Sequence, residues 1–266
     1  MWKSRILLAV VAVGIGTGLY LLPKSVVENE SQLKSETVEN APGDPHSDIP
    51  MALAEAIAAL RPLAQPVLNE KSATFADSLS RLYAQAGKYD SSAWYAGEAA
   101  TFFKSLESYR QAAARYYEAY SFAVDPGRQK VLAAEAQRFL NQVLELRPDD
   151  LDAQGQLAMT LLATAPPMQG IRKLQEIIQK DPQNEFALFN LGMLSVQTSQ
   201  YDRAQDYLAR LLEIKPDNSQ ARMLLGVAYL NGGDKDKARA EFEEVKKRDP
   251  DPAVQAAADS YLKDLR

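Results

Sequence analysis

The sequence contains no cysteine and only one histidine, His46, among its 266 residues. The lack of cysteine excludes disulfide bonds, thiolate metal sites, cysteine nucleophiles and an acylated lipoprotein cysteine. His46 stands in the stretch PGDPHSD, which is typical of a linker, so a zinc site or a histidine-dependent catalytic triad is not expected there. We therefore predict that the chain is not an enzyme and that it has no catalytic residue, no metal site and no cofactor.

An excess of positive charge is also missing. The 30 lysines and arginines are outnumbered by 35 aspartates and glutamates, which gives a formal net charge of −5. A protein that binds nucleic acid needs a basic face for the phosphates, so we expect no nucleic-acid partner. Hydrophobic residues make up 46% of the chain, which is enough to build a folded core.

The N-terminus carries an uninterrupted, mostly apolar run without charge at residues 6–22, preceded by Lys3 and Arg5. Its length is near the short end of a membrane-spanning helix and also suits the core of a signal peptide. The run ends in LYLLPKS, without small residues in a cleavage pattern, which favours a retained signal anchor over residues 1–24. The preceding positive charges predict a cytoplasmic N-terminus. We expect a single-pass protein of a bacterial inner membrane, with the remaining chain in the periplasm.

Residues 25–48 are polar and acidic and contain proline and glycine near their end, so we predict a disordered linker. Within the apolar run, Gly14 and Gly18 form a G-x-x-x-G pair, which can let two membrane helices approach closely. A homodimer is therefore an alternative, although small residues are also tolerated in membrane helices without any such role.

A repeated pattern dominates the second half of the chain. The prolines Pro148, Pro182, Pro216 and Pro250 each follow the previous one after 34 residues. The spacing defines three registers of equal length, 151–184, 185–218 and 219–252. Leucine recurs at repeat position 7, and small residues recur at positions 8 and 20. Each register shows helical periodicity twice, so we predict pairs of antiparallel helices that pack closely through the small residues and stack on their neighbours.

This pattern resembles the tetratricopeptide repeat. In the third register the matching residues are Leu225, Gly226, Tyr229, Gly233, Ala238, Phe242 and Pro250; in the second they are Leu191, Gly192, Tyr201, Ala204 and Pro216. The first register departs more, because APPMQG replaces the usual turn. The resemblance implies an all-α fold, an α-solenoid of antiparallel helix pairs, which the N-terminal transmembrane helix would precede.

Weaker copies of the repeat extend upstream. Residues 49–150 are predicted to form degenerate helical repeats, with units near 73–106 and 108–150 and a first helix at about 49–69. At the other end, residues 253–266 are predicted to form a capping helix, which a solenoid needs to cover its last exposed apolar face.

Two clusters in the sequence have competing interpretations. The acids of RPDD (147–150) with Asp152, and of EFEE (241–244), could serve acid–base or calcium chemistry, but they lack the spacing of a calcium loop. We interpret them as helix-capping acids and solvated helix faces. The aromatic run RYYEAYSF (115–122) is interpreted mainly as core, with an aromatic-lined groove as the alternative.

The resemblance also implies where a partner would bind, since the first helix of each tetratricopeptide repeat lines the concave groove at repeat positions 2, 5, 6, 9, 12 and 13. The candidate groove residues are Phe186, Phe189, Asn190, Met193, Gln197, Gln220, Met223, Val227 and Asn231. Phe189 and Met193 stand where a carboxylate clamp would need lysine and asparagine, so that mode is disfavoured. Burial of these apolar positions by neighbouring repeats or by the capping helix is the alternative.

From the sequence we therefore expect a membrane-anchored, non-catalytic scaffold that binds a protein or peptide partner and takes part in assembling an envelope complex. A self-associating assembly subunit is the alternative. The membrane-bound tetratricopeptide proteins of cytochrome c maturation have a similar layout, although no residue singles out that pathway.

Overall fold

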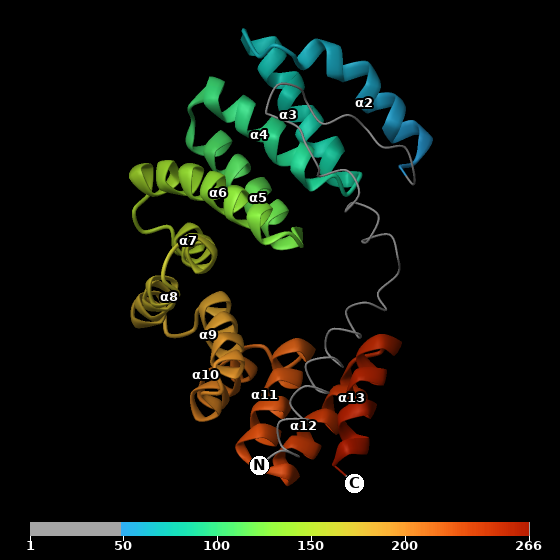
Figure 1. Ribbon diagram of the computed structural model, residues 1–266, viewed down its shortest axis with the longest axis vertical. Coiled ribbons are helices and arrows are strands. Elements are labelled where there is room, and N and C mark those ends of the chain that lie inside the picture. Colours follow the sequence, from blue (N-terminus) through green and yellow to red (C-terminus); the bar gives the residue numbers. More distant parts are fainter. Residues whose placement is uncertain (1–48, 266) are drawn as a thin grey trace. The chain divides into compact units, whose positions relative to one another are not determined.

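The computed structural model describes residues 49–265, which are helical throughout and contain no strand (Figure 1). The helices are α2 (Met51–Ala64), α3 (Glu70–Gln85), α4 (Tyr89–Phe103), α5 (Leu106–Phe122), α6 (Pro126–Leu146), α7 (Leu151–Thr164), α8 (Met168–Lys180), α9 (Glu185–Gln197), α10 (Tyr201–Ile214), α11 (Ser219–Gly232), α12 (Lys235–Arg248) and α13 (Pro252–Asp264). The prediction of an all-α fold is confirmed for this range. The predicted anchor and linker lie outside the described residues, and none of the described helices is long and apolar enough to span a bilayer.

The 34-residue period is also the period of the helix caps. Asp150, Asn184 and Asn218 precede α7, α9 and α11, and the side chain of each accepts a hydrogen bond from the backbone N–H three residues later. This cap satisfies one of the N–H groups that a helix start leaves without a partner. Each cap follows a proline by two residues, so the preceding helix ends and the next begins within one short turn.

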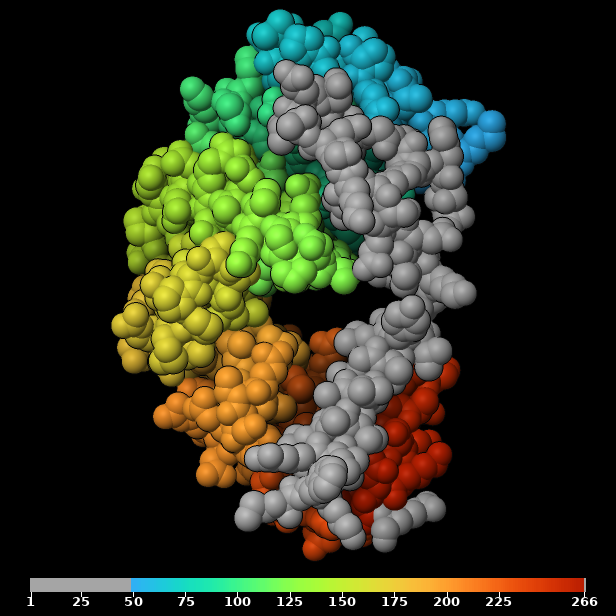
Figure 2. All heavy atoms as spheres, viewed as in Figure 1, coloured from blue at the N-terminus to red at the C-terminus, as the bar shows by residue number. Residues whose placement is uncertain are grey.

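Consecutive helices pack against each other from α2 to α13, and the first helices of neighbouring pairs also touch, α5 with α7, α7 with α9, and α9 with α11. Figure 2 shows that the side chains of successive helices fill the spaces between the ribbons of Figure 1. Gly170 shows why small residues are needed within a pair. A Cβ at Gly170 on α8 would lie 2.4 Å from the carbonyl oxygen of Ala158 on α7, so only glycine permits this approach.

The hydrophobic core consists of successive clusters, and each one joins neighbouring helix pairs. One cluster unites Leu188 of α9 and Leu208 of α10 with Leu225 of α11, and another unites Leu174 of α8 with Leu191 of α9. No helix pair therefore buries its apolar face alone, which is the property that makes a repeat stack a continuous fold.

The last helix covers the end of the stack. Phe242 of α12 is fully buried, and its ring stacks on Tyr261 of α13 with 4.8 Å between the ring centroids. Ala258 and Leu265 complete this terminal cluster. Helix α13 thus buries apolar surface of α12 that would otherwise face water.

The aromatic residues of the N-terminal half are mostly core residues. Tyr95 and Tyr116 are buried, and Tyr117 and Tyr120 pack partly buried against the core cluster that contains Tyr116. Phe122 differs, because it is 59% exposed and stacks on Tyr89 at the turn between α5 and α6. The sequence-based interpretation of the run as core therefore fails for its last residue.

Candidate functional site

The candidate groove residues lie on α9 and α11, and their exposure separates them into groups. Gln197, Gln220 and Asn231 are exposed, whereas Phe189, Met193, Met223 and Val227 are half-buried. These two helices touch each other. They thus present half-buried apolar side chains together with exposed amides and without a charged side chain among these seven positions.

Two of the candidates serve the fold itself. Phe186 lies over Gly155 of α7, where an added Cβ would be 2.8 Å from the aromatic ring. Asn190 is buried, and its side-chain amide donates a 2.8 Å hydrogen bond to the carbonyl oxygen of Phe186. Both side chains make contacts within the protein, so they are less available to a partner than the exposed amides are.

The apolar candidates are also partly covered by their neighbours. Phe189 packs against the core cluster of α9, α10 and α11. Met223 and Val227 pack against the cluster of α12 and α13. Burial by neighbouring helices and by the capping helix, which the sequence left open as the alternative, therefore contributes at these positions.

A cavity of about 570 Å³ lies beside α5, α6 and α7, outside the candidate groove; we call it the α5–α7 pocket. Its lining residues are Arg110, Ala113, Ala114, Leu140, Val143, Arg147, Pro148, Asp149, Asp150, Asp152, Ala153 and Gln156. The members Ala113, Leu140, Val143 and Ala153 are buried, with at most 6% of each exposed. The pocket thus has a floor of core residues and a rim of charged residues.

An ion pair holds one side of this rim. Nη2 of Arg110 on α5 lies 2.5 Å from Oδ2 of Asp150, whose other oxygen caps α7 at the N–H of Ala153. Burial alone would raise the pKa of Asp150, but the backbone N–H of Ala153 and the Arg110 guanidinium stabilise the carboxylate, and the net result is a lowered pKa. The Asp150 side chain is only 12% exposed, so it is a fixed part of the wall.

The repeat alignment explains why the cavity occurs here. Asp152 stands at repeat position 2, which Phe186 occupies in the next register, where its ring covers α7. Besides Arg110, the adjoining wall of α5 consists of Ala113 and Ala114. Arg110 reaches from α5 to Asp150 along one side of the pocket, but the alanines and Asp152 leave the rest of the space between α5 and α7 unfilled.

Sequence reasoning missed this pocket. It interpreted RPDD and Asp152 as capping and solvated acids, which is accurate for Asp150 but overlooks their position around a cavity. The available signal was the conjunction of repeat positions 2 and 6, Asp152 and Gln156, with the alanine run QAAAR on the preceding first helix. Neither feature alone indicates a pocket.

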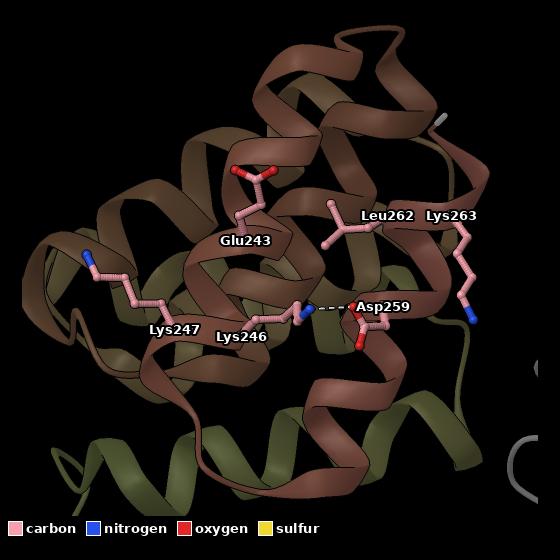
Figure 3. Close-up of a pocket in the computed structure, with 6 residues that line it drawn as sticks. All are labelled: Glu243, Lys246, Lys247, Asp259, Leu262 and Lys263. Atoms are coloured by element: carbon pink, nitrogen blue, oxygen red, sulfur yellow. Dashed lines mark ion pairs between the residues drawn. The ribbon is translucent and has the colours of Figure 1, made fainter.

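A second, open pocket lies between α12 and α13 and is lined by Glu243, Lys246, Lys247, Asp259, Leu262 and Lys263. An ion pair of 2.6 Å between Lys246 and Asp259 crosses it. Figure 3 shows Lys247 and Lys263 pointing away on opposite sides, so these charges do not converge on one point. The feature is a helix–helix seam closed by an ion pair. Within residues 49–265, no group of three acidic or histidine side chains is arranged to hold a metal ion.

Comparison with known proteins agrees with this architecture. A tetratricopeptide repeat family model matches residues 195–259. A tetratricopeptide repeat protein from Parabacteroides merdae superposes with a TM-score of 0.58 at 15% identity, over 80% of this chain and 82% of that one. MamA superposes with a TM-score of 0.50 at 18% identity, over 66% of this chain and 91% of that one. No curated protein matches the sequence. The resemblance to tetratricopeptide repeats is confirmed, and the structural likenesses show the fold.

Proposed function

Because the chain carries tetratricopeptide repeats, we propose that it is a non-catalytic scaffold that binds a protein or peptide partner along the first helices of its repeats. The observation that carries this proposal is the surface of α9 and α11. Phe189, Met193, Met223 and Val227 are only partly buried there, whereas Leu188 of α9 and Leu225 of α11 are buried. Exposed apolar surface bordered by polar groups is typical of an interaction site.

The chemistry of this surface indicates the kind of partner. Methionine side chains adapt their shape to the surface they meet, and the exposed amides of Gln197, Gln220 and Asn231 can donate and accept hydrogen bonds. A peptide or the apolar face of a helix fits such a surface.

We further propose that residues 6–22 anchor the chain in a bacterial inner membrane as a single span. The proposal rests on the uncharged run, on Lys3 and Arg5 before it, and on the missing cleavage pattern after it. The acidic stretch 25–48 would then serve as a tether between the bilayer and the repeats in the periplasm. A scaffold in this position would assemble its partners at the membrane surface of the envelope.

Self-association is the second candidate function, and one observation favours it. Phe122 and Val124, at the turn between α5 and α6, are 59% and 70% exposed. A second copy of the chain could cover this small apolar area, and the glycine pair of the N-terminal run could add to the contact.

The scaffold proposal is tested by adding charge at exposed positions of the groove surface, the surface of α9 and α11, without changing its packed residues. Gln197→Lys and Gln220→Glu together keep the net charge and suit the helix ends at which they stand. The matched control is Gln169→Glu with Gln179→Lys, at exposed positions near the two ends of α8, a second helix.

The full-length wild type and both double variants are used to capture proteins from detergent-solubilised membranes. We expect a partner that the wild type and the control retain and that the groove variant loses. Equal capture by all three would place the partner elsewhere on the chain, and capture of nothing above a blank resin would contradict the scaffold proposal.

A further inference from the structure

The floor of the α5–α7 pocket limits what can enter it. Leu140, Val143, Ala113 and Ala153 belong to the buried core, so a ligand that reaches the floor meets hydrocarbon. A polar group placed there would lose its hydration without gaining a hydrogen bond, at a cost in free energy. The part of a ligand that reaches the floor is therefore apolar.

The rim adds a charge preference. Asp150 is neutralised by Arg110, which leaves Asp149, Asp152 and Arg147 as the other charged side chains around the opening. Within residues 49–265, no side-chain hydrogen bond or ion pair engages these three. Besides the Arg110–Asp150 pair, the rim thus carries two carboxylates and one guanidinium group. Rim charges of this kind set specificity more than affinity, and here they favour a cation.

The register links this pocket to partner binding. Asp152 and Gln156 stand at repeat positions 2 and 6, the positions from which the resemblance to tetratricopeptide repeats implies partner contacts. Phe186 and Asn190 occupy these positions in the next register and are engaged within the fold. In the first register the same positions line an open cavity.

We propose that the α5–α7 pocket receives an aliphatic side chain of a partner peptide and that Asp149 and Asp152 hold a lysine or arginine next to it in the peptide. The inference rests on the proposed scaffold function and names a chemical class of partner for it. It also separates this pocket from the surface of α9 and α11, where the candidate residues carry no charge.

In the experiment, a displayed library of random peptides is selected for binding to the full-length chain. The chain is kept in a mild detergent because of its apolar N-terminal run. The variant Ala114→Leu fills the pocket from an exposed position on α5, and Ala134→Leu makes the same change at an exposed position on α6 that does not line the pocket. Circular dichroism checks that each variant keeps the helix content of the wild type.

We expect the enriched peptides to share an aliphatic residue close to a lysine or arginine. A synthetic peptide with this consensus should bind Ala114→Leu about tenfold more weakly than the wild type, since it loses its place in an apolar pocket. The peptide should bind Ala134→Leu with the same affinity as the wild type.

A second pair of variants tests the charge. Asp152→Asn should weaken binding of the same peptide about two- to fivefold, because an exposed ion pair contributes little free energy. Added salt should reduce this difference in affinity. Asp236→Asn is the matched control, because Asp236 is also an exposed aspartate at the second position of its helix, α12, and lies outside the pocket. It should leave the affinity unchanged.

The outcomes distinguish failure of this inference from failure of the proposed function. Enriched peptides that lack a basic residue, or that bind Ala114→Leu as well as the wild type, overturn the pocket assignment and leave the scaffold intact. A dimer in solution that Ala114→Leu converts to a monomer would make a second copy the occupant and overturn it too. No enrichment on the wild type or on any variant would count against peptide binding altogether.

Discussion

Arg110 on α5 and Asp150 at the start of α7 are joined by an ion pair of 2.5 Å across 40 residues of sequence. Asp150 also caps α7, so one carboxylate both starts a helix and fastens it to the preceding repeat. This pair forms one wall of the α5–α7 pocket, and its loss affects both the stability of the stack and the shape of the cavity.

Stability should depend on the ionisation of Asp150. Its pKa is lowered in the folded chain, despite burial that opposes the shift, because Ala153 and Arg110 stabilise the carboxylate. A carboxyl group with a lowered folded-state pKa stabilises the fold at a pH above its unfolded value, and this contribution is lost as the pH falls through the folded value. Urea unfolding of the wild type should therefore show this loss on acidification, and Asp150→Asn should remove that part of the pH dependence.

Two substitutions separate the cap from the ion pair. Asparagine caps helices about as well as aspartate, so Asp150→Asn should cost less than about 1 kcal/mol at neutral pH. Asp150→Ala removes the cap as well and should cost roughly 1 kcal/mol more. Asp149→Asn, which removes an equal charge from the neighbouring residue, serves as the control in the same urea titrations. Equal stability of the Asn and Ala variants would mean that the cap contributes nothing.

Gly170 should not tolerate a methyl group. Its Cβ would lie 2.4 Å from the Ala158 carbonyl oxygen, a backbone atom that cannot move without shifting α7. Gly170→Ala should therefore lower the free energy of unfolding by roughly 1–3 kcal/mol. Gly232→Ala is the control, because the nearest atom there is the flexible end of Gln205 at 3.0 Å. Alanine favours helix over glycine, so this variant should be neutral or more stable by up to about 1 kcal/mol in thermal or urea unfolding.

The stacking of Phe242 on Tyr261 should contribute much of the stability with which α13 packs on α12. Tyr261→Ala removes the partner of a fully buried phenylalanine and should cost about 1–3 kcal/mol. Tyr261→Phe keeps the ring and should change the melting temperature little. Hydrogen exchange adds a local measurement, since faster exchange of α12 and α13 in the alanine variant alone would show that the cap has loosened. Exchange rates of α12 and α13 that are the same in both variants would contradict this role.

The helix pairs were predictable because the 34-residue period couples several independent signals. The proline stops one helix, Asn184 or Asn218 caps the next, and the small residue at position 20 permits close packing within the pair. Each signal is local in sequence and acts on the backbone directly. Where they coincide, as between Pro182 and Asn218, little freedom remains for another fold.

The site was less predictable, because side-chain exposure depends on neighbours that the period does not specify. Phe186 and Asn190 stand at groove positions, yet neither is free. Because Gly155 has no side chain, the ring of Phe186 packs onto α7, and the side-chain amide of Asn190 donates a hydrogen bond to the helix backbone. The α5–α7 pocket arises from the converse situation, in which Ala113 and Asp152 leave space that no neighbour fills. Both results follow from the sizes of residues on two different helices.

The packing of Phe189 and Met223 changes what their substitution should do. If both side chains lined an open groove, Phe189→Ala with Met223→Ala would leave the melting temperature nearly intact. Each side chain packs against a core cluster instead, so the double variant should lose at least about 1 kcal/mol of stability. Thermal unfolding measures this cost, and an unchanged melting temperature would show that both side chains are free for a partner.

The proposed membrane anchor makes a prediction that does not depend on the repeats. A reporter that is active only after export, fused after residue 30, should be active and should stay with the membranes after a carbonate wash, because an uncharged run of this length partitions into the bilayer. Replacing two central residues of the run, Val11→Arg and Val13→Arg, should abolish both export and retention, since a charge near the bilayer centre costs about 2.5–3.5 kcal/mol for each arginine. Ser31→Asp with Gln32→Asp adds two charges beyond the run, of the sign that contributes little to orientation, to a longer fusion made after residue 48, and should preserve both. A shortened reporter in the soluble fraction would instead show that the run is a cleaved signal, and the repeats would then reach the periplasm without a tether.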